Sequence, residues 1–206
     1  MFKLYQTKIL PYFMNKIIGK DEIMKHRCHT LKNAKGEILE IGIGTGLNLN
    51  LYPNEVTEIT AIDPFIRELP QTKIFVKLYP DIAEKMHFQD DSFDTVVSMF
   101  TLCSVQNMDA VLAEIARVLK PNGRFIFLEH GRATTKFIRG IQILVNPFFN
   151  LFACGCNITR NYEKALMKAG FIINQYQVYR ASIFPKVIAG YLYEGVAVNE
   201  VDKSYL

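Results

Sequence analysis

Leu39-Glu40-Ile41-Gly42-Ile43-Gly44-Thr45-Gly46-Leu47-Asn48 is the stretch of this sequence that decides the fold. Ile38, Leu39 and Ile41 form a short apolar run of the kind that a parallel strand buries. The three glycines that follow allow the backbone to turn tightly and to approach a ligand closely. We expect a helix after this turn, with unpaired N–H groups at its start that face a nucleoside ligand.

The spacing of the glycines indicates which ligand fits. A dinucleotide-binding turn reads G-x-G-x-x-G, whereas here the third glycine comes one residue early, at Gly46, and Leu47 occupies the expected position. Glu40 adds a negative charge just before the first glycine, where it repels a pyrophosphate and attracts a cationic group. An ordinary glycine-rich turn without a ligand is the alternative.

A second predicted strand, residues 56–63, ends in an acid. Asp63 lies 21 residues after Gly42, and a carboxylate at a strand end can accept hydrogen bonds from both hydroxyls of a ribose. The alternative is that Asp63 only caps a helix that begins near Pro64. Strand, glycine turn, strand and acid together predict a nucleoside cofactor site.

The rest of the chain continues this alternation. Further strands are predicted at residues 74–79, 95–100 and 124–130, and residues 109–119 have the apolar spacing of an amphipathic helix. Such a pattern is typical of a doubly wound α/β fold with a mostly parallel sheet, which binds ligands at the carboxyl ends of its strands. Residues 171–180 and 187–199 read as two strands with no helix between them, which predicts an antiparallel edge pair.

Length and composition indicate one domain, residues 1–206. The chain has 206 residues, 50% of them hydrophobic and 21% charged, and no linker or repeat interrupts it. Asn146 and Pro147 interrupt the longest apolar stretch, so no run approaches the roughly 18 residues of a membrane span. No secretion signal is recognisable at the N-terminus, and four cysteines are too few for a disulfide scaffold, so we expect a cytoplasmic protein.

Two short clusters suggest a metal site. They are Cys154-Gly155-Cys156 and His26-Arg27-Cys28-His29. Neither has a second ligand pair at the spacing of a zinc finger, so we predict no metal site. A tight glycine turn and the polar face of a helix are the simpler interpretations.

The positive charge is concentrated at the N-terminus. Residues 1–36 carry eight lysines and arginines against two acids, interleaved with apolar residues, while the net charge of the chain is +4. A basic amphipathic segment of this kind, residues 1–35, can be peripheral to an anionic membrane surface or fold back as a lid over the cofactor, and the two are compatible. Nucleic acid is not an expected partner, because no basic stripe continues into the core.

Several further motifs carry a resemblance to a known family. The E-x-G-x-G-x-G turn, the D-D-S-F-D segment at 90–94, L-C-S-V at 102–105, R-V-L-K-P-N-G at 117–123 and F-L-E-H at 127–130 resemble the class I S-adenosylmethionine-dependent methyltransferases. Glu129-His130, Gln142, Asn146-Pro147, residues 155–160 and Gly190-Tyr191 resemble the branch of thiol S-methyltransferases. The resemblance implies a transferase with a seven-stranded Rossmann-like sheet, S-adenosylmethionine as cofactor and S-adenosylhomocysteine as product.

It also implies a role for individual residues. A cofactor-binding core, residues 36–130, would hold the methionine end at Glu40, Gly42, Gly44 and Gly46, and the ribose at Asp63 beside Pro64. Related enzymes bind the adenine edge through an acid and a backbone N–H. Here Ile82 stands where that acid is often found, so the expected groups are Ala83 N–H with Asp81 or Glu84. Phe100, Thr101 and Leu102 would flank the sulfonium or, alternatively, pack in the core.

Methyl transfer mainly requires that donor and acceptor be held in line, with a base only where the acceptor arrives protonated. Glu129 and His130, at the end of the fifth predicted strand, are the catalytic candidates, and a helix cap with a buried partner is the alternative. Residues 131–160 are predicted to form an apolar cover on the acceptor side, and residues 161–206 a helix and the edge strands. A cover too apolar to stay solvated favours a small lipophilic acceptor, most simply a thiol.

Two alternatives to a thiol methyltransferase stay open. A phospholipid N-methyltransferase of the phosphatidylethanolamine type would present its amine at a membrane. A non-catalytic domain would keep the fold and bind only a cofactor or a partner. The oligomeric state does not follow from the sequence.

Overall fold

The computed structural model describes residues 16–153, 155–183 and 185–199. Residues 1–15 of the predicted lid lie outside this part. The elements along the chain are α3 Asp21–Leu31, β1 Ile38–Ile41, β2 Glu58–Ile62, β3 Phe75–Tyr79, β4 Phe93–Met99, α4 Met108–Val118, β5 Leu119–His130, α5 Lys136–Phe152, α6 Tyr162–Lys168, β6 Phe171–Arg180, α7 Lys186–Ala189 and β7 Tyr191–Asn199.

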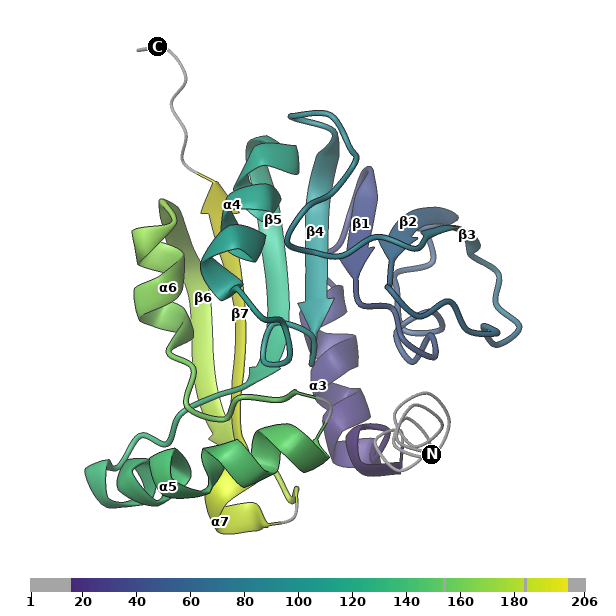
Figure 1. Cartoon of the computed structure of the whole chain (residues 1–206). Helices are drawn as coiled ribbons and strands as arrows, with labels where there is room; N and C mark the ends of the chain where they lie inside the picture. Colours follow the sequence, from purple (N-terminus) through teal and green to yellow (C-terminus); the bar gives the residue numbers. More distant parts are fainter. Residues whose placement is uncertain (1–15, 154, 184, 200–206) are drawn as a thin grey trace.

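The strands form one sheet of seven in the order β3-β2-β1-β4-β5-β7-β6 (Figure 1). The pairs β3-β2, β2-β1, β1-β4 and β4-β5 are parallel, and β7 runs antiparallel to both of its neighbours, β5 and β6. All four residues of β1 are buried, as expected of a strand covered on both faces. The predicted α/β sheet with an antiparallel C-terminal pair is confirmed.

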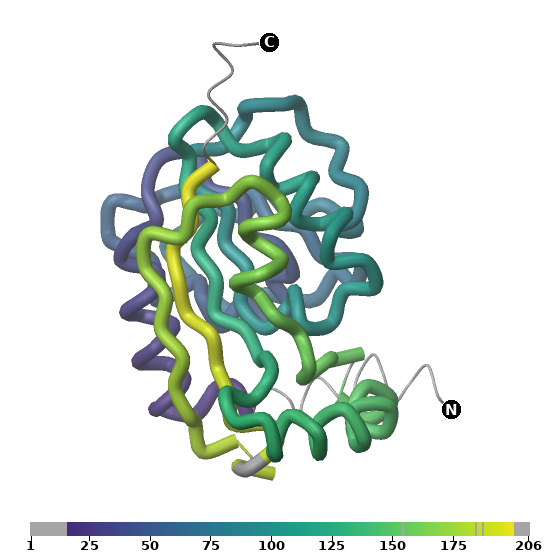
Figure 2. The backbone as a smooth tube through the Cα atoms, turned by 90° about the vertical axis from the view of Figure 1, so that its left-hand side faces the viewer, coloured from purple at the N-terminus to yellow at the C-terminus, as the bar shows by residue number. Residues whose placement is uncertain are grey.

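Helices cover both faces of the sheet. Figure 2 shows α3 on one side and α4 with α6 on the other. One cluster of buried side chains joins α4 and α6 to the sheet, and a second joins α3 to the opposite face. Helix α5 lies across the end of the sheet at which β4 and β5 finish (Figure 1). The carboxyl ends of the parallel strands, where doubly wound folds bind ligands, therefore face α5.

Two predicted elements differ in the structure. No helix follows the glycine turn, because residues 47–52 form consecutive tight turns, with hydrogen bonds from Leu49 N to Gly46 O (3.1 Å) and from Leu51 N to Asn48 O (2.8 Å). Bonds between residues three apart are those of a 3₁₀ turn, and such turns stay short. The predicted strand at 187–199 begins only at residue 191, because Pro185 starts the short helix α7, in which Ala189 N donates to Pro185 O (2.8 Å).

Candidate active site

The glycine turn between β1 and the following turns borders open space at one position only. Gly42, Gly44 and Gly46 all have positive φ angles, of 70°, 57° and 76°. A Cβ atom on Gly42 would lie 2.3 Å from Thr101 Oγ1, so this part of the turn packs directly on the end of β4. A Cβ on Gly44 would meet nothing nearer than 3.9 Å. Gly44 is therefore the glycine at which a ligand can approach the backbone.

Glu40 braces this turn from within the protein. Its carboxylate is buried and accepts hydrogen bonds from Asn48 Nδ2 (2.9 Å) and Tyr52 Oη (2.7 Å). Burial raises the pKa of Glu40, and the two donors oppose that change. Its carboxylate therefore holds the turn through Asn48 and Tyr52, and the predicted place of Glu40 beside the methionine end stays a prediction.

Arg27, on α3, is a buried cation beside this turn that the sequence interpretation missed. Its side chain is 3% exposed, and Nη1 donates to Asn48 Oδ1 at 2.6 Å. The guanidinium carbon lies 4.8 Å from the centre of the Phe100 ring, and Nε has no hydrogen-bond partner among the described residues. Desolvation lowers the pKa of Arg27 to about 10, so the group stays charged near neutral pH. A buried charge with an unsatisfied donor is a candidate for an anionic ligand group.

Asp63 links the end of β2 to the glycine turn. Oδ2 accepts from Gly44 N (2.9 Å) and Oδ1 from Phe65 N (2.8 Å), while Arg67 Nη1 lies 3.7 Å from Oδ1. An ionised carboxylate has about four acceptor positions, so it can still accept from ribose hydroxyls. No helix begins after the exposed Pro64, so the alternative of a helix cap at Asp63 does not hold; the bond to Phe65 N closes a local turn.

Both carboxylates expected on the adenine side accept hydrogen bonds from protein groups. Glu84 Oε1 accepts from Gln106 N at 2.9 Å, at the start of α4, and Asp81 pairs with His87. Ala83 is buried and Ile82 is exposed. An ionised carboxylate can accept further bonds, so the adenine contacts expected of Ala83 and of Asp81 or Glu84 stay a prediction.

Glu129 organises the turn that follows β4. Its carboxylate is fully buried; Oε1 accepts from Ser98 Oγ (2.8 Å), Thr101 N (3.0 Å) and Leu102 N (2.9 Å), and Oε2 accepts from Cys103 N (3.1 Å). Burial raises its pKa, and these four donors oppose the rise. These four hydrogen bonds give Glu129 a role in positioning the turn, and its predicted catalytic role stays a prediction.

Of the three residues expected around the sulfonium, two border the site. Thr101 Oγ1 donates to Gly42 O at 3.4 Å, which joins the end of β4 to the glycine turn. Phe100 is half-buried and has a φ of 59°, an unusual conformation for a bulky residue. Leu102 is fully buried in the core cluster of α4, so core packing is the correct interpretation of that residue.

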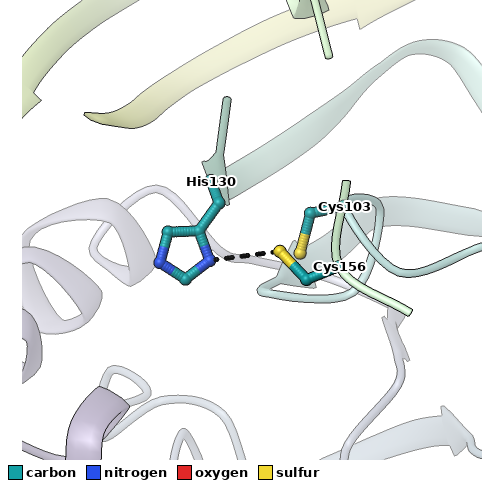
Figure 3. Close-up of side chains that lie close together, drawn as sticks. All are labelled: Cys103, His130 and Cys156. Atoms are coloured by element: carbon teal, nitrogen blue, oxygen red, sulfur yellow. Dashed lines mark hydrogen bonds between the residues drawn. The ribbon is translucent and has the colours of Figure 1, made fainter. Parts of the chain in front are cut away.

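His130, at the end of β5, contacts the Phe100 ring, which also contacts Arg27. The two rings meet edge to face with their centres 5.0 Å apart. His130 is buried; Nδ1 lies 3.7 Å from Cys156 Sγ, and Nε2 has no hydrogen-bond partner among the described residues (Figure 3). A buried imidazole with one unsatisfied nitrogen at this strand end keeps its place as a catalytic candidate.

Two cysteines complete the surroundings of His130. Cys103 follows β4 and Cys156 follows α5, and both point towards the histidine from different parts of the chain (Figure 3). The ligand atoms of these three residues all lie within 4.8 Å of one another. Hydrogen bonding by the Cys103 thiol, opposed by burial and helped by His130, lowers the pKa of Cys156. The prediction of no metal site rests on clusters of neighbouring residues. Cys103, His130 and Cys156 are far apart in the sequence, so that reasoning could not identify them as a group.

Helix α5 differs from the predicted cover. Gln142 is its only buried residue, while Ile138, Val145 and Phe149 pack inward, the last two against Cys103 and Cys156. Six apolar residues of the predicted cover do not pack on the core but are exposed: Phe137, Ile143, Leu144, Phe148, Leu151 and Phe152. Only the inward side chains of α5 pack on the core, so no other described element covers the outer face of the helix. No helix in the described part of the chain is long and apolar enough to span a membrane.

Known proteins resemble the chain over most of its length and over its core. Residues 39–127 match a family described as "Methyltransferase domain". Thiol S-methyltransferase TMT1A of Homo sapiens is 31% identical over 213 residues, which cover 93% of this chain and 86% of that protein. Phosphatidylethanolamine N-methyltransferase of Cereibacter sphaeroides is 35% identical over 119 residues, covering 53% and 58%. A solved S-adenosylmethionine-dependent methyltransferase of Thermotoga maritima is 18% identical, with a TM-score of 0.67 over 97% of this chain and 100% of that one, and this likeness supports the fold.

Proposed function

We propose that this chain, which belongs to the S-adenosylmethionine-dependent methyltransferases in the branch of thiol S-methyltransferases, transfers a methyl group to the sulfur of a small lipophilic thiol. The relative that matches most of the chain is named as a thiol methyltransferase, whereas the phospholipid enzyme matches about half of it. The observation that carries the proposal is the buried His130 with its free Nε2, at the strand end where an acceptor would lie.

The residues on the cofactor side fit S-adenosylmethionine. Gly44 offers backbone beside open space, and the Asp63 carboxylate next to it can accept from ribose hydroxyls. We propose that Arg27, whose Nε is a buried donor without a partner, binds the carboxylate of the methionine part. When bound, the cofactor supplies a methyl carbon that its sulfonium has already activated. The protein then has to orient the acceptor and remove its proton.

The acceptor side favours sulfur over nitrogen. The walls around His130 are the Phe100 ring and, from α5, Val145 and Phe149, which pack on the two cysteines. A protonated thiol is uncharged and loses little solvation on entering such surroundings, whereas an ammonium group must lose both its hydration and its proton before it can attack. An apolar site therefore selects a thiol, or an amine that a lipid delivers.

A panel of acceptors tests this function. Purified protein is incubated with S-adenosylmethionine labelled in its methyl group and with alkyl thiols, aryl thiols, small amines or phosphatidylethanolamine vesicles, and the methylated products are identified by mass spectrometry. We expect thioethers from the lipophilic thiols. Turnover of phosphatidylethanolamine but of no thiol would replace this proposal with the phospholipid enzyme. Cofactor binding without turnover of any acceptor would favour the non-catalytic domain.

We also propose a peripheral membrane contact, on the outer face of α5. This face exposes Leu144 (76%) and Phe148 (69%), and the helix carries Lys136 and Arg139 near its start and contains no acidic residue. An amphipathic helix with an apolar face and basic flanks suits an anionic lipid surface. The contact predicted for residues 1–35 stays a prediction, since residues 1–15 lie outside the described part.

Sedimentation with vesicles distinguishes α5 from the rest of the surface. Leu144→Ser with Phe148→Ser should reduce the fraction bound to vesicles containing phosphatidylserine at low salt. Met167→Ser is the matched control, because this methionine is 65% exposed on α6, away from α5. Equal binding by the α5 variant and the control would exclude α5 as the contact.

A further inference from the structure

We propose that Cys103, His130 and Cys156 bind a zinc ion, and that the sulfur of the acceptor thiol takes the fourth position on this ion. The metal site rests on the geometry of the three residues alone. The part about the acceptor deepens the proposed function and rests on it. Zinc would then supply the thiolate at neutral pH, with His130 acting through Nδ1 as a ligand.

The three ligand atoms are already close to tetrahedral spacing. With zinc bonds of roughly 2.3 Å to sulfur and 2.0 Å to nitrogen, ligand atoms in a tetrahedral site lie about 3.5 to 3.8 Å apart. Cys156 Sγ and His130 Nδ1 are 3.7 Å apart, and all three atoms lie within 4.8 Å of one another. A shift of at most about 1.3 Å in the position of Cys103 Sγ completes the arrangement.

The backbone that carries each ligand is held in place by other groups. Cys103 N donates to Glu129 Oε2 (3.1 Å), and Cys103 O accepts from Asn157 N (2.7 Å), which ties the turn after β4 to the loop that bears Cys156. The O atom of His130 accepts from Tyr162 Oη at 2.7 Å. Fixed outer contacts of this kind orient metal ligands and raise metal affinity. Cys103 is thus bonded through its backbone to Asn157, the residue that follows Cys156.

Gly155 shows that the two segments must approach closely. Its φ is +80°, and a Cβ atom there would lie 3.2 Å from Ser104 O, tighter than an ordinary contact. Asn150 holds the same glycine, because Gly155 N donates to Asn150 O (3.0 Å) and Asn150 Nδ2 donates to Gly155 O (2.6 Å). The end of α5 therefore sets where Cys156 stands.

The donor set selects zinc and leaves room for a substrate. Two thiolates and one imidazole are ligands that zinc prefers, and catalytic zinc sites have three protein ligands and one open position. Among residues 16–153, 155–183 and 185–199, no fourth histidine, cysteine or acid belongs to this group. Two thiolates also cancel the charge of Zn²⁺. A thiolate bound to a neutral centre keeps more of its electron density for attack than one bound to a cationic centre.

The position of the group matches the reaction. The Phe100 ring contacts His130 on one side and the Arg27 guanidinium on another, so one aromatic side chain separates the proposed metal from the cofactor side. The acceptor R–SH would release its proton to bulk water on binding zinc. A sulfur lone pair then forms a bond to the methyl carbon, and the bond from that carbon to the sulfonium breaks with its electron pair. The products are the thioether R–S–CH₃ and S-adenosylhomocysteine, and the neutral thioether is a weak ligand that leaves the zinc.

Metal binding is measured first. Protein purified without chelators or added thiols should contain about one zinc ion per chain. A metal-free sample titrated with Co²⁺ should gain the visible and near-ultraviolet bands of tetrahedral thiolate coordination. Cys103→Ser, Cys156→Ser and His130→Ala should each weaken zinc binding at least tenfold. Cys28→Ser, which changes a cysteine of α3, should not.

The acceptor position is measured on the same cobalt protein. Addition of 2-mercaptoethanol should shift the cobalt bands, and Cys154→Ser should leave both the bands and the shift unchanged. Failure of the wild-type chain to bind zinc or cobalt, or a Cys103–Cys156 disulfide in its place, would overturn the metal site. Loss of the bands in Cys154→Ser, or bands that no thiol shifts, would overturn the open position.

The two proposals fail separately. Full thiol methylation by metal-free protein would overturn the zinc proposal and leave the proposed function intact. Zinc binding as described, with no thiol methylated and no shift on adding thiol, would overturn the proposed function and the acceptor position and leave the metal site. Because the wild-type titration needs no variant, the proposal stays testable even if one of the substitutions prevents folding.

Discussion

Replacing Arg27 by methionine tests whether this buried cation binds the cofactor carboxylate. Methionine keeps an unbranched apolar stem but removes the guanidinium, which in the wild type donates to Asn48 and lies over Phe100. The variant leaves Asn48 Oδ1 without this donor, which costs about 1 to 3 kcal/mol. Removing a desolvated charge offsets this cost, since buried ions are often replaced by apolar groups without loss. We expect the stability of the cofactor-free protein to change by less than about 2 kcal/mol.

The effect on the cofactor should be larger and specific. A hydrogen bond to a charged group contributes about 1.5 to 3 kcal/mol, which corresponds to roughly a 10- to 150-fold rise in the Kd of S-adenosylhomocysteine. Isothermal titration calorimetry measures this Kd for wild type and for Arg27→Met. The same titration with the decarboxylated analogue, which lacks only the carboxylate, should give nearly equal Kd values for the two proteins.

The comparison of the two ligands decides between binding and structure. A structural role for Arg27 predicts that the substitution weakens both ligands by the same factor, because both need the same glycine turn. That result would refute the assignment of Arg27 to the carboxylate. A loss confined to the ligand with the carboxylate is expected only from a direct contact.

Four further substitutions test the site and its frame. Asp63→Ala should weaken S-adenosylhomocysteine by about 1.5 to 3 kcal/mol in the same titration, because hydrogen bonds from the ribose to a charged acceptor are lost; unchanged affinity would exclude the ribose contact. Gly44→Ala should cost only about 1 to 2 kcal/mol of unfolding free energy, since its φ of +57° is strained but its surroundings are open, yet it should abolish cofactor-induced thermal stabilisation. His130→Ala should lower thiol turnover by ~10²-fold or more with unchanged S-adenosylhomocysteine affinity; full turnover would remove His130 from the mechanism. The hydrogen bond from Arg117 lowers the pKa of Glu114 below its ordinary value of 4.5. The ionised carboxylate therefore stabilises the fold above the ordinary pKa, and this stabilisation is lost as the pH falls through the lowered value. Glu114→Gln should flatten the acid side of a plot of melting temperature against pH, and an unchanged plot would contradict this.

The sequence predicts the sheet well because its signals are local. The apolar run at β1, the three glycines and the acid after β2 lie within 26 residues, and each reflects a backbone or hydrogen-bonding need of the same short segment. The helix expected after the glycine turn fails for an equally local reason. The Asn48 side chain donates a hydrogen bond to Glu40 and accepts one from Arg27. Pro53 then follows within a few residues and prevents regular helical hydrogen bonds from continuing.

The parts of the site that the sequence did not predict depend on contacts between distant segments. Arg27 is a single cation on an otherwise ordinary amphipathic helix, and only the packing of α3 brings it to Asn48, 21 residues away. Cys103 and Cys156 have no recognisable spacing and meet only because β4 and the end of α5 reach the same edge. The apolar pattern of α5 shows that one face avoids water, but it does not show whether protein or another surface covers that face.

Glu129 connects the two halves of the site through one buried carboxylate. Its Oε1 fixes Thr101 N, and the hydroxyl of that threonine reaches Gly42 O in the cofactor turn, while its Oε2 fixes the backbone of Cys103 beside His130. Burying this anion is costly, as its raised pKa indicates, and the four donors around it compensate. A neutral side chain could not accept four hydrogen bonds at these positions, so the charge is what sets the distance between the cofactor turn and the thiol side. In-line methyl transfer depends on that distance, so the buried carboxylate at the end of β5 can influence the reaction by positioning both sides of the site.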